Sequence, residues 1–247
     1  FNWEDPLLFE DQLTEEEKLV RDTAREYAQE KLLPRILEAN RNESFDREIM
    51  NEMGELGFLG ATIGPEYGCA GVNYVCYGLL AREIERIDSA YRSTLSVQSS
   101  LVMWPIYQYG TDAQKDRWLS VLQQGKALGC FALTESEFGS NPGGMRTRAV
   151  RDGNSYVING EKAWITNGAV ADVAVVWAKE EDTVRAFLVE KGASGFETSD
   201  IHGKWSMRAS ITSSLAFSDC RIPVENVLPG AVVLKAALGC LTQARYG

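Results

Sequence analysis

One run of the sequence places charged and hydroxyl side chains at spacings suited to binding a carboxylate. Ser93 and Ser96 follow Arg92 at positions i+1 and i+4, and Glu85 lies two helical turns before Arg92. A guanidinium presents paired N–H donors to a carboxylate, and hydroxyl groups add further hydrogen bonds. This pattern predicts a substrate with a negatively charged tail. On spacing alone, a surface ion pair of Arg92 with Glu85 or Asp88 explains the same residues equally well.

The scarcity of histidine and the placement of cysteine exclude several chemistries within this segment. His202 is the single histidine, so Ser-His-Asp and Cys-His hydrolases, HExxH metalloproteases and multi-histidine metal sites are excluded. We expect His202 to be a structural or surface residue. The five cysteines form no C-x-x-C pair and are odd in number. They indicate a reducing compartment and neither a disulfide framework nor a metal site.

The composition is that of a globular protein with an acidic surface. The chain has 247 residues, 45% of them hydrophobic, and a formal net charge of -10. This length suffices for a substantial core in one large or two ordinary domains. The negative charge argues against binding to nucleic acid or anionic membranes. The apolar runs are too short to predict a membrane span.

The first part of the chain, up to about residue 126, is predicted to be helical. Thr14 and Glu17 form a capping box that opens a helix, which we expect to end at Pro34. Helical periodicity also predicts the segments 46–56, 74–87, 91–109 and 112–124. The glycine-dense stretch 57–71 lacks the lysine and preceding strand of a phosphate-binding loop, so we interpret it as a tight connection.

From about residue 128 the pattern changes to short strands. Alternating or β-branched runs predict strands at 147–150, 156–158, 162–165, 173–178, 185–190 and 214–217. Turns are predicted at Asp152-Gly153, Asn159-Gly160 and Asn167-Gly168, a loop at 223–230, and a helix from Val233 to Gly247. The fold class is therefore α+β, with a helical domain (1–126), an antiparallel β-domain (127–231) and the start of a further helical domain (232–247).

Two motifs carry a family resemblance. The run Phe131-Ala132-Leu133-Thr134-Glu135-Ser136-Glu137-Phe138-Gly139-Ser140-Asn141-Pro142 and the run Trp164-Ile165-Thr166-Asn167 resemble the acyl-CoA dehydrogenase family of flavoproteins. Within that family the sequence is most similar to the glutaryl-CoA dehydrogenases. The resemblance extends from Glu4-Asp5-Pro6-Leu7 to Ala244-Arg245-Tyr246-Gly247. It implies the acyl-CoA dehydrogenase fold, with most of the C-terminal helical domain missing from this chain.

The resemblance implies FAD as the cofactor. Phe131, Ala132, Leu133 and Thr134 would contact the pyrimidine edge of the flavin, where negative charge develops on reduction. The Trp164-Ile165-Thr166 stretch would also bind it, with Trp164 against the ring system and Thr166 near N5. Ser140 is similar to a serine that holds phosphate groups of CoA or FAD. Without the resemblance, Trp164 would be interpreted as an aromatic residue of the sheet core.

The resemblance also assigns a substrate and a reaction. Arg92, Ser93 and Ser96 would bind the distal carboxylate of glutaryl-CoA, Glu85 would tune that site, and Arg245 would lie near the acyl-CoA. The reaction is oxidation at the α–β bond with decarboxylation to crotonyl-CoA, in the degradation of lysine and tryptophan. No residue of this chain is assigned as the catalytic base, which the resemblance places in a glutamate beyond residue 247.

The implied partners are acyl-CoA, electron-transfer flavoprotein and three further copies in a homotetramer. The implied compartment is the mitochondrial matrix in a eukaryote or the cytoplasm in a bacterium. Three alternatives stay open: a glutaryl-CoA dehydrogenase that does not decarboxylate, a dehydrogenase of another short acyl-CoA, and a truncated module that binds acyl-CoA and flavin without catalysis. The helical run that reaches the last residue favours a shortened form of a longer protein.

Overall fold

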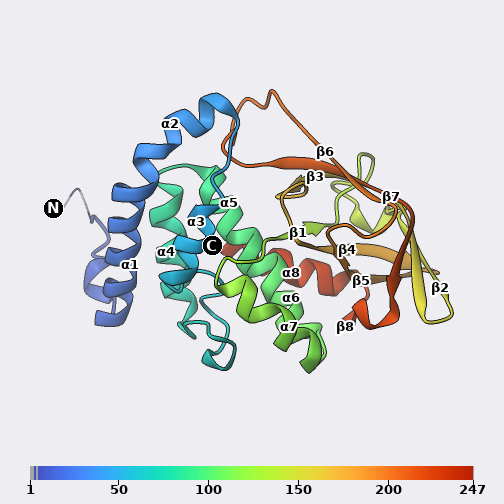
Figure 1. The fold of residues 1–247 in the computed structure, drawn as a ribbon. Coiled ribbons are helices and arrows are strands. Elements are labelled where there is room, and N and C mark those ends of the chain that lie inside the picture. The colour runs from blue at the N-terminus through green and yellow to red at the C-terminus, as the bar shows by residue number, and fades with distance from the viewer. Residues whose placement is uncertain (1–2, 4, 247) are drawn as a thin grey trace.

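The computed structural model describes residue 3 and residues 5–246, in which helices come first and a sheet follows. Figure 1 shows the helices at one side, the strands at the other, and the last helix, α8, between them. Glu4 and Gly247, which belong to the motifs above, lie outside the described residues. The α+β class is confirmed.

Local signals set the ends of several helices. The Thr14 hydroxyl accepts from the Glu17 amide, and the Glu17 carboxylate accepts from the Thr14 amide, so the predicted capping box forms. Thr111 and Gln114 do the same further along the chain. The α-helices are α1 (Glu15–Tyr27), α2 (Leu33–Asn42), α3 (Glu48–Glu55), α4 (Tyr74–Glu85), α5 (Ser89–Ser96), α6 (Trp104–Tyr109), α7 (Asp112–Gln123) and α8 (Leu234–Tyr246).

The predicted end of the first helix at Pro34 is wrong, because the chain passes this proline in helical form. A π-helical segment, Ala28–Leu32, leads directly into α2, and the Leu33 amide donates to the Ala28 carbonyl. Pro34 then falls in the first turn of α2, where its missing N–H costs little. The π-helical segment Val97–Met103 joins α5 to α6 ahead of Pro105 in the same way.

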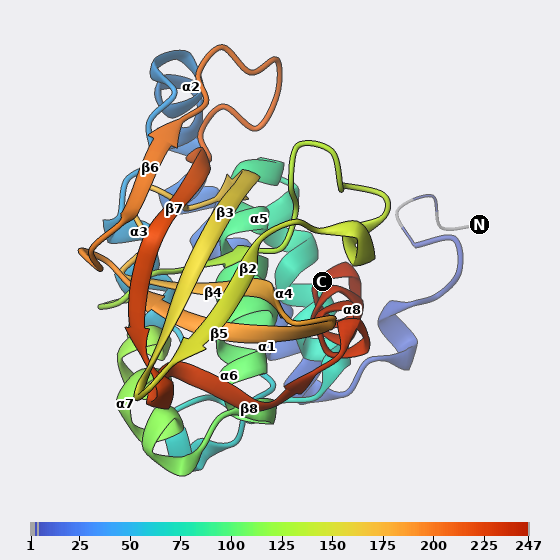
Figure 2. The same cartoon turned by 90° about the vertical axis from the view of Figure 1, so that its right-hand side faces the viewer.

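Eight strands form one sheet in the order β6-β7-β3-β2-β4-β5-β8, with β1 paired to β4 beside that path. Most pairs are antiparallel, as expected, but β4 pairs in parallel with both β1 and β2, which share one of its edges. Figure 2 shows β2, β3 and β7 crossing β4 and β5 at a steep angle. The strands are β1 (Gly129–Ala132), β2 (Arg148–Asp152), β3 (Ser155–Thr166), β4 (Val173–Glu180), β5 (Thr183–Glu190), β6 (Phe196–Asp200), β7 (Thr212–Pro223) and β8 (Val227–Val232).

The turn predicted at Asn159-Gly160 is wrong, since β3 runs straight through it. Its partner strand β7 instead carries an extra residue between the pairs Ile158–Cys220 and Gly160–Phe217. Gly160 has a φ of +143°, and a Cβ there would lie 2.6 Å from the Thr147 Cα. The glycine therefore serves a close approach of two strands and not a turn.

Two strands at the edges of the sheet have no clear sequence signal. Strand β6 is almost entirely exposed, so it lacks the apolar alternation that marks a strand. Strand β8 contains Pro229 and Gly230 and lies within the segment predicted as a loop. An edge strand tolerates proline because one side of its backbone is not paired.

Strand β4 separates two hydrophobic cores. Val173, Val175 and Trp177 face the helices, whereas Ala174 and Val176 belong to a second core enclosed by the sheet. Both faces of this strand are buried, which accounts for its continuous apolar sequence. The first of these cores, to which Val173, Val175 and Trp177 belong, thus joins the helices to the sheet.

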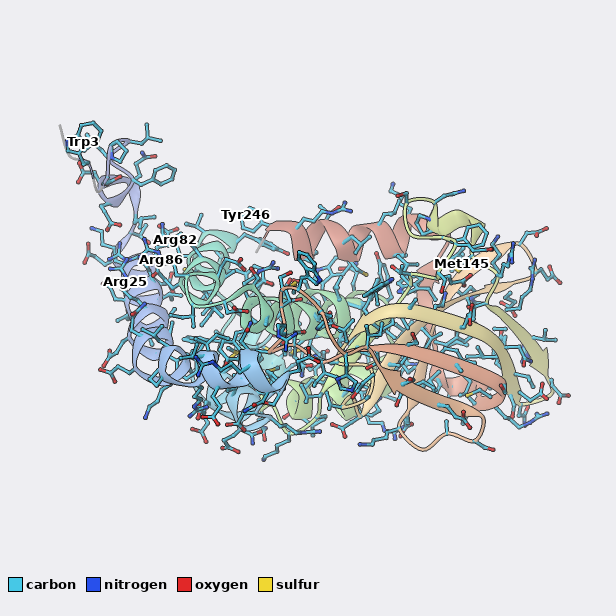
Figure 3. All side chains as sticks on the ribbon, turned by 90° about the horizontal axis from the view of Figure 1, so that it is seen from above. Trp3, Arg25, Arg82, Arg86, Met145 and Tyr246 are labelled. Atoms are coloured by element: carbon cyan, nitrogen blue, oxygen red, sulfur yellow. The ribbon has the colours of Figure 1, made fainter. Side chains whose placement is uncertain are left out.

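Helix α8 lies along the top of the molecule in Figure 3, where Tyr246 at its end lies beside Arg82 of α4. Met145 marks a loop of the β-domain beyond the other end of the helix. A Cβ on Gly143 of that loop would lie 3.4 Å from Leu234. Because a helix rises about 1.5 Å per residue, the two ends of α8 are roughly 18 Å apart.

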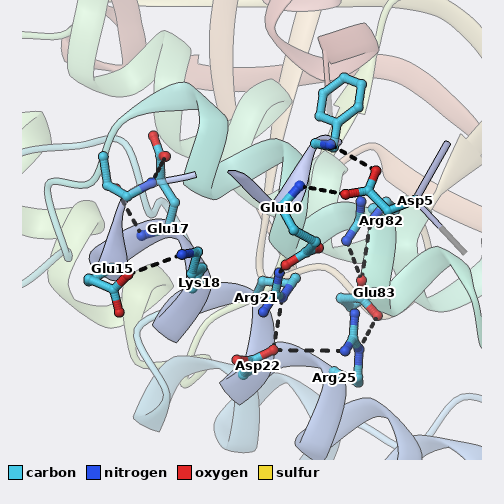
Figure 4. A network of polar contacts seen from close by, with 12 residues as sticks. Asp5, Glu10, Glu15, Glu17, Lys18, Arg21, Asp22, Arg25, Arg82 and Glu83 are labelled. Atoms are coloured by element: carbon cyan, nitrogen blue, oxygen red, sulfur yellow. Dashed lines mark hydrogen bonds and ion pairs between the residues drawn. The ribbon is translucent and has the colours of Figure 1, made fainter. Parts of the chain in front are cut away.

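A polar network joins α1 to α4 (Figure 4). The Glu83 carboxylate is 1% exposed and receives hydrogen bonds from Arg25 and Arg82, with Arg86 at 3.6 Å. Burial would raise the pKa of Glu83, but the bonds from Arg25 and Arg82 lower it below its usual value. Within the part of the chain that the structure describes, the helices lack the length and apolar character needed to cross a membrane.

Candidate functional site

The β-domain presents an exposed tryptophan beside a hollow of about 530 Å³, which we call the Trp164 hollow. Between the pairs Lys162–Leu215 and Ile165–Ser213, β3 carries one extra residue, and Trp164 in this bulge has a φ of +61°. The indole is 62% exposed, whereas Ile165 is buried. The bulge turns Trp164 outward, so the interpretation as a core aromatic is wrong and an accessible stacking surface results.

The loop 201–207 forms the opposite wall of the Trp164 hollow. The Lys204 ammonium donates to the carbonyls of Met207 and Ser210 and to the Thr212 hydroxyl at 2.6 to 3.0 Å. Burial lowers the pKa of Lys204 below its usual range. These bonds close the loop around its own lysine.

Helix α2 holds the same loop from outside. Glu43 at the end of α2 accepts from the Gly203 amide at 3.0 Å and pairs with Arg208 at 2.5 Å. The guanidinium of Arg208 also donates to the Asn40 carbonyl at 2.9 Å. His202 is exposed and its Nδ1 lies 3.3 Å from Glu43, consistent with a surface role. A wall of the Trp164 hollow is thus fixed by the helical part of the chain.

The two motifs predicted to bind a cofactor meet next to this hollow. The Ala163 amide donates to the Thr134 carbonyl at 2.9 Å, which joins the end of β1 to β3. Phe131, Ala132 and Leu133 are buried, and Thr134 is half-buried. Thr166 lines the hollow together with Trp164. The structure therefore brings residues 131–134 and 164–166 into one region.

A buried ion pair lies directly behind the junction of β1 and β3. The Lys162 ammonium is 3.0 Å from Glu135 Oε1 and donates to the Leu133 carbonyl at 3.0 Å. The Glu135 carboxylate also accepts from the amides of Arg146 and Thr147 and from the Thr147 hydroxyl. Every oxygen of this carboxylate therefore has a partner, as a buried charge requires.

The pair is ionised at neutral pH. Burial alone would raise the pKa of Glu135, but the hydrogen bonds and the Lys162 charge lower it to about 2. Burial lowers the pKa of Lys162 to about 8, against the opposing effect of Glu135. The sequence analysis missed this pair because its members lie 27 residues apart and share no local spacing.

A second hollow of about 290 Å³, the Arg92 hollow, opens in the helical part of the chain. Glu85 and Arg92 line it with Arg82 and Tyr246, and Arg92 Nε lies 2.8 Å from Glu85 Oε2. Burial would raise the pKa of Glu85, but hydrogen bonds from Ser89 and Arg92 lower it. Nε is thus engaged, and a guanidinium carries four further N–H groups on Nη1 and Nη2.

Glu85 and Arg92 do not lie two turns apart on one helix, as their spacing in the sequence indicated. Helix α4 ends at Glu85, and α5 begins at Ser89 with Asp88 as its N-cap. The two side chains meet across this corner. The reason is that the Asp88 side chain accepts from the Ala90 amide, which starts a new helix.

The remaining predicted substrate residues do not gather at one point. The Ser96 hydroxyl donates to the Ala244 carbonyl at 3.3 Å, and Ser93 is half-buried on α5. Arg245 is exposed near the end of α8. Ser140 is exposed in the β-domain loop that approaches the start of α8, so α8 separates it from the Arg92 hollow.

Arg82 and Tyr246 are lining residues that the sequence analysis did not select. Tyr246 packs edge-on against Tyr74 with ring centroids 5.6 Å apart, and a Cβ on Gly78 would lie 3.4 Å from its ring. Glycine at 78 thus leaves room for the tyrosine. The glycine at position 78, inside the helical run Tyr74–Glu85, was the sequence signal for a close contact on this helix.

The donor set around the Trp164 hollow fits a flavin. An exposed indole provides an apolar face, and the Thr166 hydroxyl provides a polar group at the edge of the hollow. Such a combination matches a planar ring system with an apolar face and a polar rim.

Comparison with known proteins gives a consistent family. Residues 14–126 match the acyl-CoA dehydrogenase N-terminal domain, and residues 130–220 match its middle domain. The chain belongs to the acyl-CoA dehydrogenase family. The family resemblance stated from the motifs is therefore confirmed.

Three relatives illustrate the range within the family. A structure described as a glutaryl-CoA dehydrogenase from Mycobacterium smegmatis in complex with FADH2 is 47% identical, with a TM-score of 0.94 over 96% of this chain and 61% of that one. The mitochondrial short-chain specific acyl-CoA dehydrogenase of Mus musculus is 36% identical over 96% of this chain and 59% of its own length. The mitochondrial isovaleryl-CoA dehydrogenase of Pongo abelii is 37% identical over 92% and 56%.

This acyl-CoA dehydrogenase family member thus spans less than two thirds of these relatives. The relatives differ in the acyl group that their names specify. Family membership therefore leaves the substrate to be argued from the Arg92 hollow.

Proposed function

We propose that this chain forms the flavin-binding and substrate-selecting part of an FAD-dependent acyl-CoA dehydrogenase that oxidises glutaryl-CoA. The observation that carries the proposal is the Arg92 guanidinium in a hollow, 2.8 Å from Glu85 and 28% exposed. The alternatives are another short acyl-CoA as substrate and a glutaryl-CoA dehydrogenase that does not decarboxylate.

FAD binds at the Trp164 hollow in this proposal. When bound, FAD supplies the hydride acceptor for the β carbon of the acyl chain. Trp164 would stack on the ring, Thr166 would lie near N5, and residues 131–134 would hold the pyrimidine edge. The junction of β1 and β3 supports this assignment, since it holds both motifs together through the bond from Ala163 to Thr134.

Arg92 selects the substrate by its charge. A carboxylate that enters a partly buried pocket loses hydration and needs a cationic partner. The Nη groups of Arg92 can hold it in a two-point contact, while Glu85 orients the guanidinium through Nε. Ser93 and Arg245 lie on the helices that form this end without lining the hollow, and the Ser96 hydroxyl bonds the Ala244 carbonyl. Ser140, beyond the other end of α8, suits the phosphate-bearing end of a long acyl-CoA.

The reaction removes a proton from the α carbon and a hydride from the β carbon of glutaryl-CoA, which gives glutaconyl-CoA. The γ carboxylate then leaves as CO2, its electron pair forms a dienolate, and protonation gives crotonyl-CoA. A catalytic carboxylate for the first proton is expected beyond residue 247. Electron-transfer flavoprotein as acceptor, a homotetramer, and a matrix or cytoplasmic location belong to the same proposal.

The test compares two substrates in the FAD-loaded full-length enzyme, which includes the region beyond residue 247. Glutaryl-CoA and butyryl-CoA are oxidised with an electron acceptor by wild type, by Arg92→Ala and by Arg86→Ala as the control. Arg86 is 58% exposed and pairs with Glu83 outside the hollow. We expect Arg92→Ala to lower kcat/KM for glutaryl-CoA about 100-fold and for butyryl-CoA much less, because only the former loses a charge partner.

Equal losses for both substrates would show that Arg92 has only a structural role. Rapid oxidation of butyryl-CoA without oxidation of glutaryl-CoA by the wild type would overturn the substrate assignment. Product analysis then separates crotonyl-CoA from glutaconyl-CoA, the latter being the product of an enzyme that does not decarboxylate.

A further inference from the structure

Lys162 is a buried cation that contacts the backbone of the cofactor motif. Its side chain has no exposed surface, and its ammonium lies 3.0 Å from both the Leu133 carbonyl and Glu135. Met145 Sδ is the third neighbour, at 4.0 Å. The sequence resemblance gave this lysine no role, although it stands two residues before Trp164.

The contact with the Leu133 carbonyl affects the whole peptide group between Leu133 and Thr134. The Leu133 carbonyl and the Thr134 N–H belong to the same planar trans peptide, so they point in opposite directions. A charged donor on the carbonyl polarises the peptide and makes its N–H a stronger donor. The Leu133 carbonyl points toward the buried ammonium, so the Thr134 N–H points away from it.

The carboxylate of Glu135 does not cancel this effect at the carbonyl. Its charge is spread over hydrogen bonds from the Arg146 amide, the Thr147 amide and the Thr147 hydroxyl at 2.6 to 3.0 Å. The ammonium, in contrast, touches the Leu133 oxygen directly. Glu135 therefore keeps the lysine charged and in place while the lysine acts on the peptide.

We propose that Lys162 is a positioning residue that strengthens the Thr134 N–H as a hydrogen-bond donor to the bound flavin and so raises the flavin reduction potential. This inference rests on the proposed function, in which residues 131–134 contact the pyrimidine edge. A donor at that edge favours the reduced ring because reduction places negative charge there. Lys162 thus tunes the cofactor without touching it.

The test measures the midpoint potential of FAD in the wild-type holoenzyme and in variants. The double variant Lys162→Gln with Glu135→Gln removes both charges and retains an amide donor toward Leu133. We expect its ratio of oxidised to reduced FAD affinity to change about tenfold in favour of oxidised FAD, a shift of about -30 mV for a two-electron couple. Lys179→Met removes a lysine charge elsewhere on the sheet and should leave the potential unchanged.

A second variant keeps the test decisive if the neutral pair fails to fold. Lys162→Arg retains a cation beside Leu133 and should keep the wild-type potential, whereas a drop equal to that expected for the double variant overturns the inference. An unchanged potential in a folded double variant overturns it as well. A wild-type protein that binds no FAD at all refutes the proposed function instead, so the two failures are distinguishable.

Discussion

The Trp164 hollow and the Arg92 hollow are built in opposite ways. Around Trp164 the backbone is fixed in place: a β-bulge turns the indole outward, and the buried ion pair of Lys162 and Glu135 holds the adjoining strand ends together. Around Arg92, side chains from two helices meet at a corner, where Arg92 is 28% and Glu85 42% exposed.

The two ion pairs therefore differ in how much each contributes to the stability of the fold. A fully buried ion pair costs several kcal/mol to break, because the remaining charge has no solvent. A half-exposed pair contributes little to folding but is free to change partners when an anion enters. Under the proposed function, the region that binds FAD is thus tied to the fold, and the region that binds the substrate is less constrained by it.

The largest difference is expected when the cation beside each hollow, Lys162 or Arg92, is removed. Lys162→Met should lower the free energy of unfolding by about 3–5 kcal/mol, because Glu135 stays buried without its ion-pair partner. Arg92→Met should lower it by only about 0–1 kcal/mol. Denaturant unfolding of both variants measures this, and equal losses would show that the two hollows are equally tied to the fold.

Acid sensitivity provides a second test. Glu135 has a pKa of about 2 in the folded protein against 4.5 for the free side chain, so the unfolded state binds more protons between these values. Its stabilisation is present above about pH 4.5 and is lost as the pH falls toward 2. The free energy of unfolding should therefore fall more steeply from pH 5 to 2.5 in wild type than in Glu135→Gln. Parallel curves would contradict an ionised Glu135 in the fold.

The smallest expected effect concerns the exposed indole. Trp164→Ala should weaken FAD binding about tenfold through loss of the stacking face. Its melting temperature should change little, because the side chain is 62% exposed. Trp164→Phe keeps an aromatic face and should retain most of the affinity in a flavin fluorescence titration. A large loss of stability in Trp164→Ala would instead show that the indole supports the sheet.

Short-range signals in the sequence predicted structure well. Thr14 and Thr111 begin helices because each side chain reaches an amide only three residues away. Pro34 misled the prediction, since a π-helical turn before it removes the conflict between proline and helix. Gly160 also misled it, because its special φ serves contact with Thr147 and not a local turn.

The helix caps at Thr14 and Thr111 and the order of helices before strands follow from residues a few positions apart in the sequence. The exposure of Trp164, the contacts of Lys162 with Glu135 and Leu133, and the contact of Glu85 with Arg92 arise only in the folded chain. Strand register, bulges and buried ion pairs join distant segments, and their energies depend on packing that exists only once the chain has folded.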